Sequence, residues 1–130
     1  MTSKLDQHRR ALAGILGYLA SHGLAGSVIG PDNIANDEDP ALPAREFVDL
    51  VRWLESEGAV RVPAVPSMQR GVFPKVQLTA IGLRILGLES PIAKDQTVES
   101  SLAKSTSPET RAKIGEFIGS VLGGFFNSQK

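Results

Sequence analysis

The chain of 130 residues carries 14 Lys and Arg against 14 Asp and Glu, and 42% of its residues are hydrophobic and 22% charged. This length and composition predict one compact domain with its own core, and they exclude a wholly disordered protein. The absence of Cys from the sequence excludes disulfides, thiolate metal sites and cysteine nucleophiles. With no charged-then-apolar leader and no apolar run long enough to cross a bilayer, we expect a cytoplasmic protein without a transmembrane segment.

The first predicted element is a helix over residues 5–22. Its apolar residues recur at three- and four-residue spacing, which places them on one stripe of the helix: Leu12, Ile15, Leu16 and Leu19. Gly23 ends this helix, because glycine adopts a left-handed conformation without steric cost. The stretch that follows, residues 26–43, is rich in Gly, Pro, Asn and acidic residues. It has room for only a short strand around Val28-Ile29 or a single helical turn near Ile34.

A second helix is predicted over about residues 44–57. Pro43 is placed to begin it and Gly58 to end it. The apolar residues of this segment stand at i, i+3, i+4 and i+7, so they form one buried side: Phe47, Leu50, Val51 and Leu54.

After Gly58 the apolar period changes from helical spacing to alternation. Alternating valines on either side of a tip at Gln69-Arg70-Gly71 predict a β-hairpin over residues 60–78. Prolines within the segment indicate that its strands lie at a sheet edge, since Pro cannot donate to a strand ladder. Thr79 then caps a third helix that ends at Gly87.

The composition shifts again after the third helix. Residues 89–110 are crowded with Ser and Thr and hold few large apolar residues, which predicts a tether. Residues 111–128 return to helical apolar spacing and predict one amphipathic helix. We therefore expect three parts: a domain over residues 1–88, the tether and the C-terminal helix.

Two local motifs carry a resemblance to a known family. A helix closes with Leu-x-x-x-Gly-hydrophobic at residues 54–59, and the returning strand runs into Leu-Thr-x-x-Gly-x-x-x-Leu at residues 78–86. In this order, the motifs resemble the winged helix-turn-helix superfamily, in particular its small bacterial and phage members, over residues 5–88. The resemblance implies an α+β fold, mainly helical with a small β-hairpin. One departure is that residues 26–43 leave room for only a poor version of one helix of the family.

Charge is distributed unevenly along the chain. Residues 58–88 hold cations and no carboxylate, whereas residues 23–43 hold acids and no cation. Phosphate neutralisation by Lys and Arg supplies most non-specific affinity for duplex DNA. The candidate DNA-binding residues lie on the second helix and the hairpin: Arg45, Arg52, Arg61, Gln69, Arg70 and Lys75. Against this interpretation, the second helix also carries four acids, Glu46, Asp49, Glu55 and Glu57.

The C-terminal helix is the candidate element for dimerisation or for binding a partner. Its apolar side consists of Ile114, Phe117, Ile118, Val121, Leu122 and Phe125. A neighbouring row of small residues, Gly115, Gly119 and Gly123, permits close approach of another helix. The alternative is that this helix packs back on its own domain.

The sequence shows no catalytic signature, cofactor motif or metal site, so we expect a protein that is not an enzyme. His8 and His22 lie at opposite ends of one predicted helix, about 21 Å apart at 1.5 Å per residue, and cannot share a metal ion through it. The acidic run at residues 32–39 lacks the ligand spacing of a calcium loop. No glycine pattern of a phosphate-binding loop occurs.

Two hypotheses follow. The first is a small DNA-binding regulator or accessory protein that contacts double-stranded DNA through the second helix and the hairpin, and forms a homodimer through the C-terminal helix. The second is a protein-interaction adaptor, in which the winged helix is a scaffold and the C-terminal helix binds a protein partner.

Overall fold

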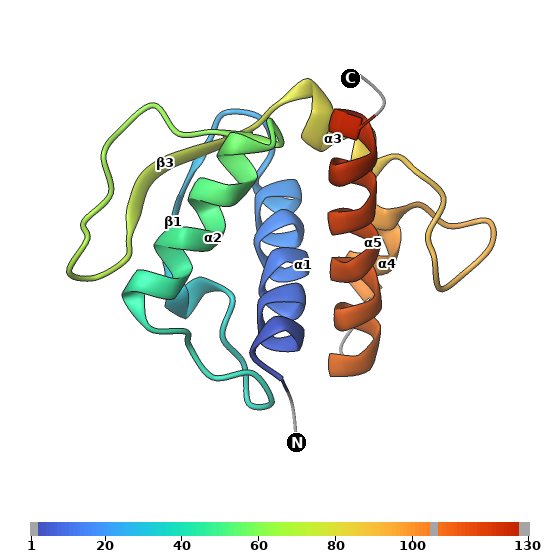
Figure 1. Ribbon diagram of the computed structural model, residues 1–130, viewed down its shortest axis with the longest axis horizontal. Coiled ribbons are helices and arrows are strands. Elements are labelled where there is room, and N and C mark those ends of the chain that lie inside the picture. The colour runs from blue at the N-terminus through green and yellow to red at the C-terminus, as the bar shows by residue number, and fades with distance from the viewer. Residues whose placement is uncertain (1–2, 105–106, 128–130) are drawn as a thin grey trace.

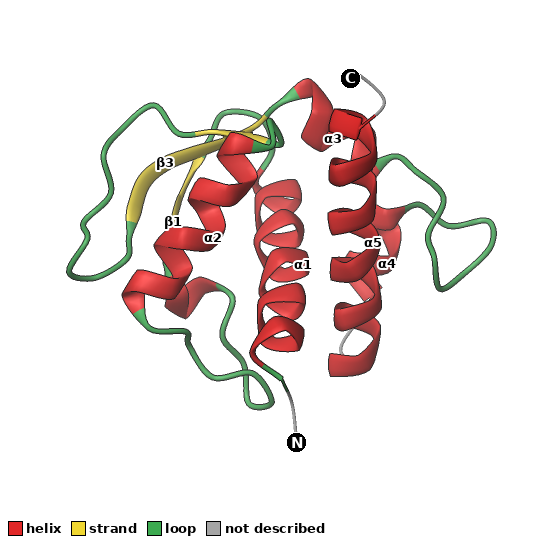
Figure 2. Ribbon diagram, in the orientation of Figure 1, coloured by secondary structure: helices red, strands yellow, loops and turns green. Residues whose placement is uncertain are grey.

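In a computed structural model of the protein, residues 3–104 and 107–127 are described, with residues 124–127 described by their backbone alone. The elements in chain order are α1 (Lys4–His22), β1 (Ser27–Ile29), the 3-10 turn η1 (Pro31–Asn33), α2 (Ala44–Ser56), β2 (Val60–Arg61), β3 (Phe73–Leu78), α3 (Ala80–Leu86), α4 (Val98–Lys104) and α5 (Pro108–Asn127). Figure 1 colours the chain in this order and labels the five helices, β1 and β3. The fold is α+β, with a small antiparallel sheet among the helices (Figure 2). This winged-helix-like arrangement confirms the predicted fold class.

The sheet has three strands in the order β1-β3-β2, and both pairings are antiparallel. The predicted hairpin is therefore present, and β1 adds a third strand where the sequence left room for one. Between the pairs Ser27–Val76 and Ile29–Phe73, β3 has one residue more than β1. This bulge leaves Lys75 exposed beside the buried Val76.

α1 lies at the centre of the molecule, with α2 and the sheet on one side and α4 and α5 on the other (Figure 1). All these elements contribute to one core. Its largest fully buried side chains include Ile15, Leu16 and Leu19 of α1, Phe47 and Leu54 of α2, Phe73 of β3, Ile85 and Leu86 of α3, and Ile114, Ile118 and Leu122 of α5.

Local hydrogen bonds explain where several elements begin. The Ser3 hydroxyl accepts a bond from the backbone N–H of Asp6 at the start of α1, and the Thr79 hydroxyl accepts from Gly82 at the start of α3. The Thr79 hydroxyl also donates to the carbonyl of Gly58, whose positive φ of 87° closes α2. Thr79 therefore ties the beginning of α3 to the end of α2.

The structure corrects the predicted tether over residues 89–110. This segment contains α4, and Glu89 pairs with Thr97 in an isolated antiparallel bridge. Inside it, the hydroxyl of Ser101 donates to that of Ser90 at 2.6 Å, and both side chains are buried. The Ser-rich composition concealed an ordered segment because these hydroxyls satisfy one another within the protein.

The predicted division into a domain and a separate C-terminal helix is also corrected. α5 begins at Pro108 and lies alongside α1 as part of the same core (Figure 1). Asp39 reinforces the joint, because one carboxylate oxygen accepts from Arg10 of α1 at 2.7 Å and the other from Arg111 of α5 at 2.8 Å. The described chain is thus one folded body rather than a domain followed by a free helix.

Candidate nucleic-acid interface

One side of α2 is open to solvent, and it carries both signs of charge. Arg45, Asp49 and Arg52 are exposed and stand four and three residues apart, which places them on one row of the helix. The opposite side of α2 is buried in the core through Phe47, Val51 and Leu54. The core therefore determines that the charged row faces outward.

Two of the three acids within α2 form ion pairs with cations, and the fourth predicted acid, Glu57, follows the helix as its C-terminal cap. The Glu46 carboxylate binds the amine of Lys4 at 3.2 Å and the imidazole Nε2 of His8 at 3.0 Å. These hydrogen bonds, with His8 contributing most, hold the pKa of Glu46 below its usual value. Glu55 accepts from Arg52 at 2.8 Å.

Asp49 differs from these two acids. Its carboxylate makes no ion pair and no side-chain hydrogen bond among the described residues, and the same holds for the guanidinium of its neighbour Arg45. The ion pairs that the sequence spacing permits between Asp49 and the two arginines do not form. Asp49 thus presents an unneutralised charge in the middle of the exposed row.

The hairpin between β2 and β3 folds back toward the beginning of α2. Gly71 has a positive φ of 72°, and a Cβ built on it would lie 2.9 Å from Cα of Ala44. Arg70 and Ala44 also line one hollow, and the acidic residue Asp32 lies in the lining of the same hollow. Gln69 and Arg70, both exposed at the hairpin tip, therefore lie next to the first turn of α2, which carries Arg45.

Arg61 and Lys75 lie elsewhere, on the solvent face of the sheet. Arg61 pairs with Gln77, and Lys75 and Gln77 both cover Gly26, so these side chains share the face opposite to the buried Val76.

Arg52 of α2 lies against the opposite face of β3. Its guanidinium carbon lies 5.9 Å from the ring centre of the buried Phe73. The six candidate residues thus divide into a helix–hairpin surface, consisting of Arg45, Arg52, Gln69 and Arg70, and a sheet surface, consisting of Arg61 and Lys75.

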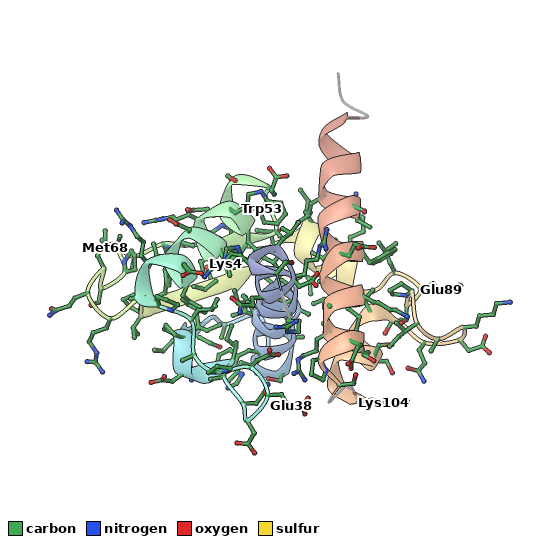
Figure 3. The ribbon with its side chains drawn as sticks, turned by 60° about the horizontal axis from the view of Figure 1, so that its bottom comes forward. Lys4, Glu38, Trp53, Met68, Glu89 and Lys104 are labelled. Carbon is green, nitrogen blue, oxygen red and sulfur yellow. The ribbon has the colours of Figure 1, made fainter. Side chains whose placement is uncertain are left out.

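Cations predominate at the hairpin end of the molecule. Nitrogen-tipped side chains project from the end at which Met68 is labelled, whereas Glu38 projects from a different part (Figure 3). Among the described residues, the hairpin cations Arg61, Arg70 and Lys75 make no ion pair with a carboxylate. The cations that cluster in the sequence of the hairpin therefore also cluster on one part of the protein surface.

The hairpin also exposes apolar side chains that our sequence analysis missed. Val65 is 80% exposed and Met68 is 60% exposed. Both residues fall in the loop between two predicted strands and close to Pro63 and Pro66, where no ladder constrains them. Their position in this loop could have indicated from the sequence that their side chains would stay outside the core.

The candidate dimerisation residues of α5 occupy a different environment from the one expected. Ile114, Ile118 and Leu122 are fully buried within the protein, and Phe117 and Val121 are partly buried against the same core. The side chain of Phe125 lies outside those that the structure describes. An apolar stripe indicates that one side of a helix is buried, but it does not show which surface covers that side. In this protein, α1 covers the apolar side of α5.

The three glycines of the α5 row also differ in their surroundings. A Cβ on Gly115 would overlap the carbonyl oxygen of Arg9, whereas nothing lies within 4 Å of one built on Gly119 or Gly123. Only Gly115 therefore serves a close approach of helices in this fold.

Neither a metal centre nor a membrane span is apparent in the described parts of the chain. They hold no group of three or more His, Cys, Asp or Glu side chains arranged to bind a metal ion, and no helix long and apolar enough to cross a membrane. Comparison of the chain with protein-family models, curated proteins and solved structures gives no match.

Proposed function

We propose that the protein is a non-enzymatic regulator or accessory protein that binds double-stranded DNA through its winged-helix-like arrangement. One observation carries the proposal: the helix–hairpin surface brings the exposed Arg45 and Arg52 of α2 together with Arg70 of a hairpin that holds no carboxylate, so its arginines outnumber the unpaired Asp49 in the same row. Lys and Arg concentrated on one surface are what phosphate binding requires.

The shape of this surface also suits a duplex. α2 spans 13 residues, about 20 Å at 1.5 Å per residue, and its exposed row is free to enter a major groove about 12 Å wide. In that orientation, Gln69 and Arg70 at the hairpin tip lie beside the beginning of α2 and reach the neighbouring phosphates. Arg61 and Lys75, on the sheet surface, contact a separate stretch of backbone.

The test is fluorescence anisotropy of a labelled random-sequence duplex, titrated with the protein at about 50 mM and about 200 mM salt. We expect binding that weakens steeply over this range. Arg70→Ala should weaken binding and lower the slope of log affinity against log salt by about 0.9, the value for one lost phosphate contact.

Lys94→Ala is the matched control for Arg70→Ala. Lys94 is exposed in the loop that precedes α4, remote from the helix–hairpin surface in sequence, and its removal deletes the same unit of charge. We expect the salt slope of this variant to equal that of the wild type. Equal losses from both variants would show attraction to net charge alone and would contradict the proposal.

A protein-interaction adaptor is the second candidate, and the exposed apolar residues of the hairpin favour it. Val65 and Met68 are the kind of side chain that a protein partner buries. The buried side of α5 cannot be the binding element of such an adaptor, because α1 already covers it. Absence of DNA binding at the lower salt concentration would favour this candidate and place its contact at the hairpin.

A further inference from the structure

The unpaired carboxylate of Asp49 lies in the middle of the proposed DNA-contacting row. Arg45 and Arg52 flank it on the same side of α2, and none of the described cations neutralises it. If that side of α2 faces DNA, as the proposed function requires, the carboxylate meets a surface of phosphates and is repelled by them. A hydrogen-bond donor on the DNA at this position compensates for the repulsion, so duplexes that present one bind more tightly than those that do not.

Only certain base edges supply such a donor in the major groove. Cytosine presents its N4 amino group there, without an acceptor on the same base, and carboxylates pair with this group. Adenine also has an amino group, but its N7 acceptor lies beside that group and repels a carboxylate. Guanine presents acceptors alone, which suit arginine.

We propose that Asp49 is the specificity-determining residue of α2 and that it accepts a hydrogen bond from the amino group of a cytosine. On this proposal, Arg45 and Arg52 donate to guanines nearby. The ligand class is therefore a duplex with a G·C core, rather than duplex DNA of any sequence. This inference rests on the proposed function and specifies which duplex that function requires.

The spacing along α2 agrees with such a core. Arg45 lies about 6 Å and Arg52 about 4.5 Å from Asp49 along the helix axis, at 1.5 Å per residue. Base pairs are spaced at about 3.4 Å, so each arginine falls one or two steps from the cytosine.

Arg52 is also held in position before DNA arrives. Its guanidinium binds Glu55 at 2.8 Å and lies over the ring of Phe73. An immobilised side chain loses less conformational entropy on binding than a free one.

The experiment selects bound sequences from short duplexes whose central positions are randomised, using the full chain, and then measures affinities by anisotropy. We expect the wild type to select a G·C core and to prefer it to a pool of A·T pairs alone by about tenfold. Asp49→Asn should change the selected base at one position from cytosine to adenine, because an amide pairs with the N6 and N7 of adenine. Asp49→Ala should bind the A·T pool more tightly than the wild type does and lose the preference at the cytosine position, while the guanines contacted by Arg45 and Arg52 are still selected.

Glu38→Gln is the matched control, since it removes an exposed carboxylate outside α2 and should leave the selected sequence unchanged. Salt-dependent binding with no base preference, or an Asp49→Ala variant that selects the same core with the same ratio, would overturn this inference alone. Absence of salt-dependent binding to every duplex would overturn the proposed function together with it.

Discussion

Helices α2 and α5 show how similar apolar patterns lead to different surfaces. Both helices repeat large apolar residues at helical spacing, and both pack beside α1 or the sheet (Figure 1). α2 keeps a charged row in solvent, including the unpaired Asp49 and Arg45. α5 packs its apolar side, and its backbone at Gly115, against α1.

Apolar stripes and exposed charged rows carry different information about a helix. An apolar stripe shows that a helix side will be buried, but it does not distinguish burial within the chain from burial against a partner. A charged row that stays in solvent next to a cationic hairpin remains available to a ligand, whereas the buried side of α5 is already covered by α1. In this protein, α2 is therefore the stronger candidate for recognition, and α5 is a structural element.

The largest effect expected from this comparison is loss of an α5 core residue. Ile118 is fully buried, so Ile118→Ala should lower the free energy of unfolding by about 2–5 kcal/mol through lost burial and the cavity left behind. Val65→Ala, at an exposed hairpin position, should change it by less than about 0.5 kcal/mol. Urea unfolding followed by circular dichroism measures both. Similar values for the two variants would refute the docking of α5 on α1.

A smaller effect is expected at the helix contact itself. Gly115→Ala forces a Cβ into the carbonyl of Arg9 and should cost about 1–3 kcal/mol. Gly119→Ala is the control on the same helix, because its Cβ meets open space and the substitution favours the helix by up to about 1 kcal/mol. Thermal unfolding should therefore shift in opposite directions for the two variants, and a shift in the same direction would contradict the contact.

The smallest effect concerns the polar contact between α2 and α1. The pKa of Glu46 is held below its usual value of 4.5 by the His8 and Lys4 hydrogen bonds. A carboxyl with a lowered folded-state pKa stabilises the protein above its usual pKa, and this contribution is lost as the pH falls through the folded value. Glu46→Gln should therefore reduce the drop in Tm between pH 7 and acid below pH 4.5.

Glu38→Gln provides the comparison for this pH experiment, because Glu38 is exposed and makes no ion pair among the described residues. Its Tm should fall with pH as in the wild type. An unchanged acid response in Glu46→Gln would mean that the Lys4 and His8 contacts contribute nothing to stability.

Sequence reasoning predicted the local elements of the fold well. The predicted helix at residues 44–57 is observed at Ala44–Ser56, and the cap by Thr79 is confirmed. These features depend on short-range patterns: apolar period, a proline at the beginning and a glycine at the end. The strand at Ser27–Ile29 was anticipated only as one of two options, because its pairing with β3 joins distant segments.

Long-range contacts account for the errors and for the incomplete view of the candidate interface. Residues 89–104 are held by long-range and buried contacts such as the bond between Ser90 and Ser101, which a Ser-rich composition conceals. Which charges are neutralised depends on distant partners, as Lys4 and His8 are for Glu46. For the same reason, the sequence pattern names six candidate cationic and amide residues but does not show that the fold divides them between two surfaces.

The placement of α5 in the core has a consequence for biosynthesis. Leu122 and its buried neighbours complete the core of a fold whose sheet and α2 are made much earlier. At ordinary translation rates, the ribosome adds the residues between β3 and Leu122 over a time on the order of seconds. Through that interval, the nascent chain exposes the side of α1 that α5 later covers.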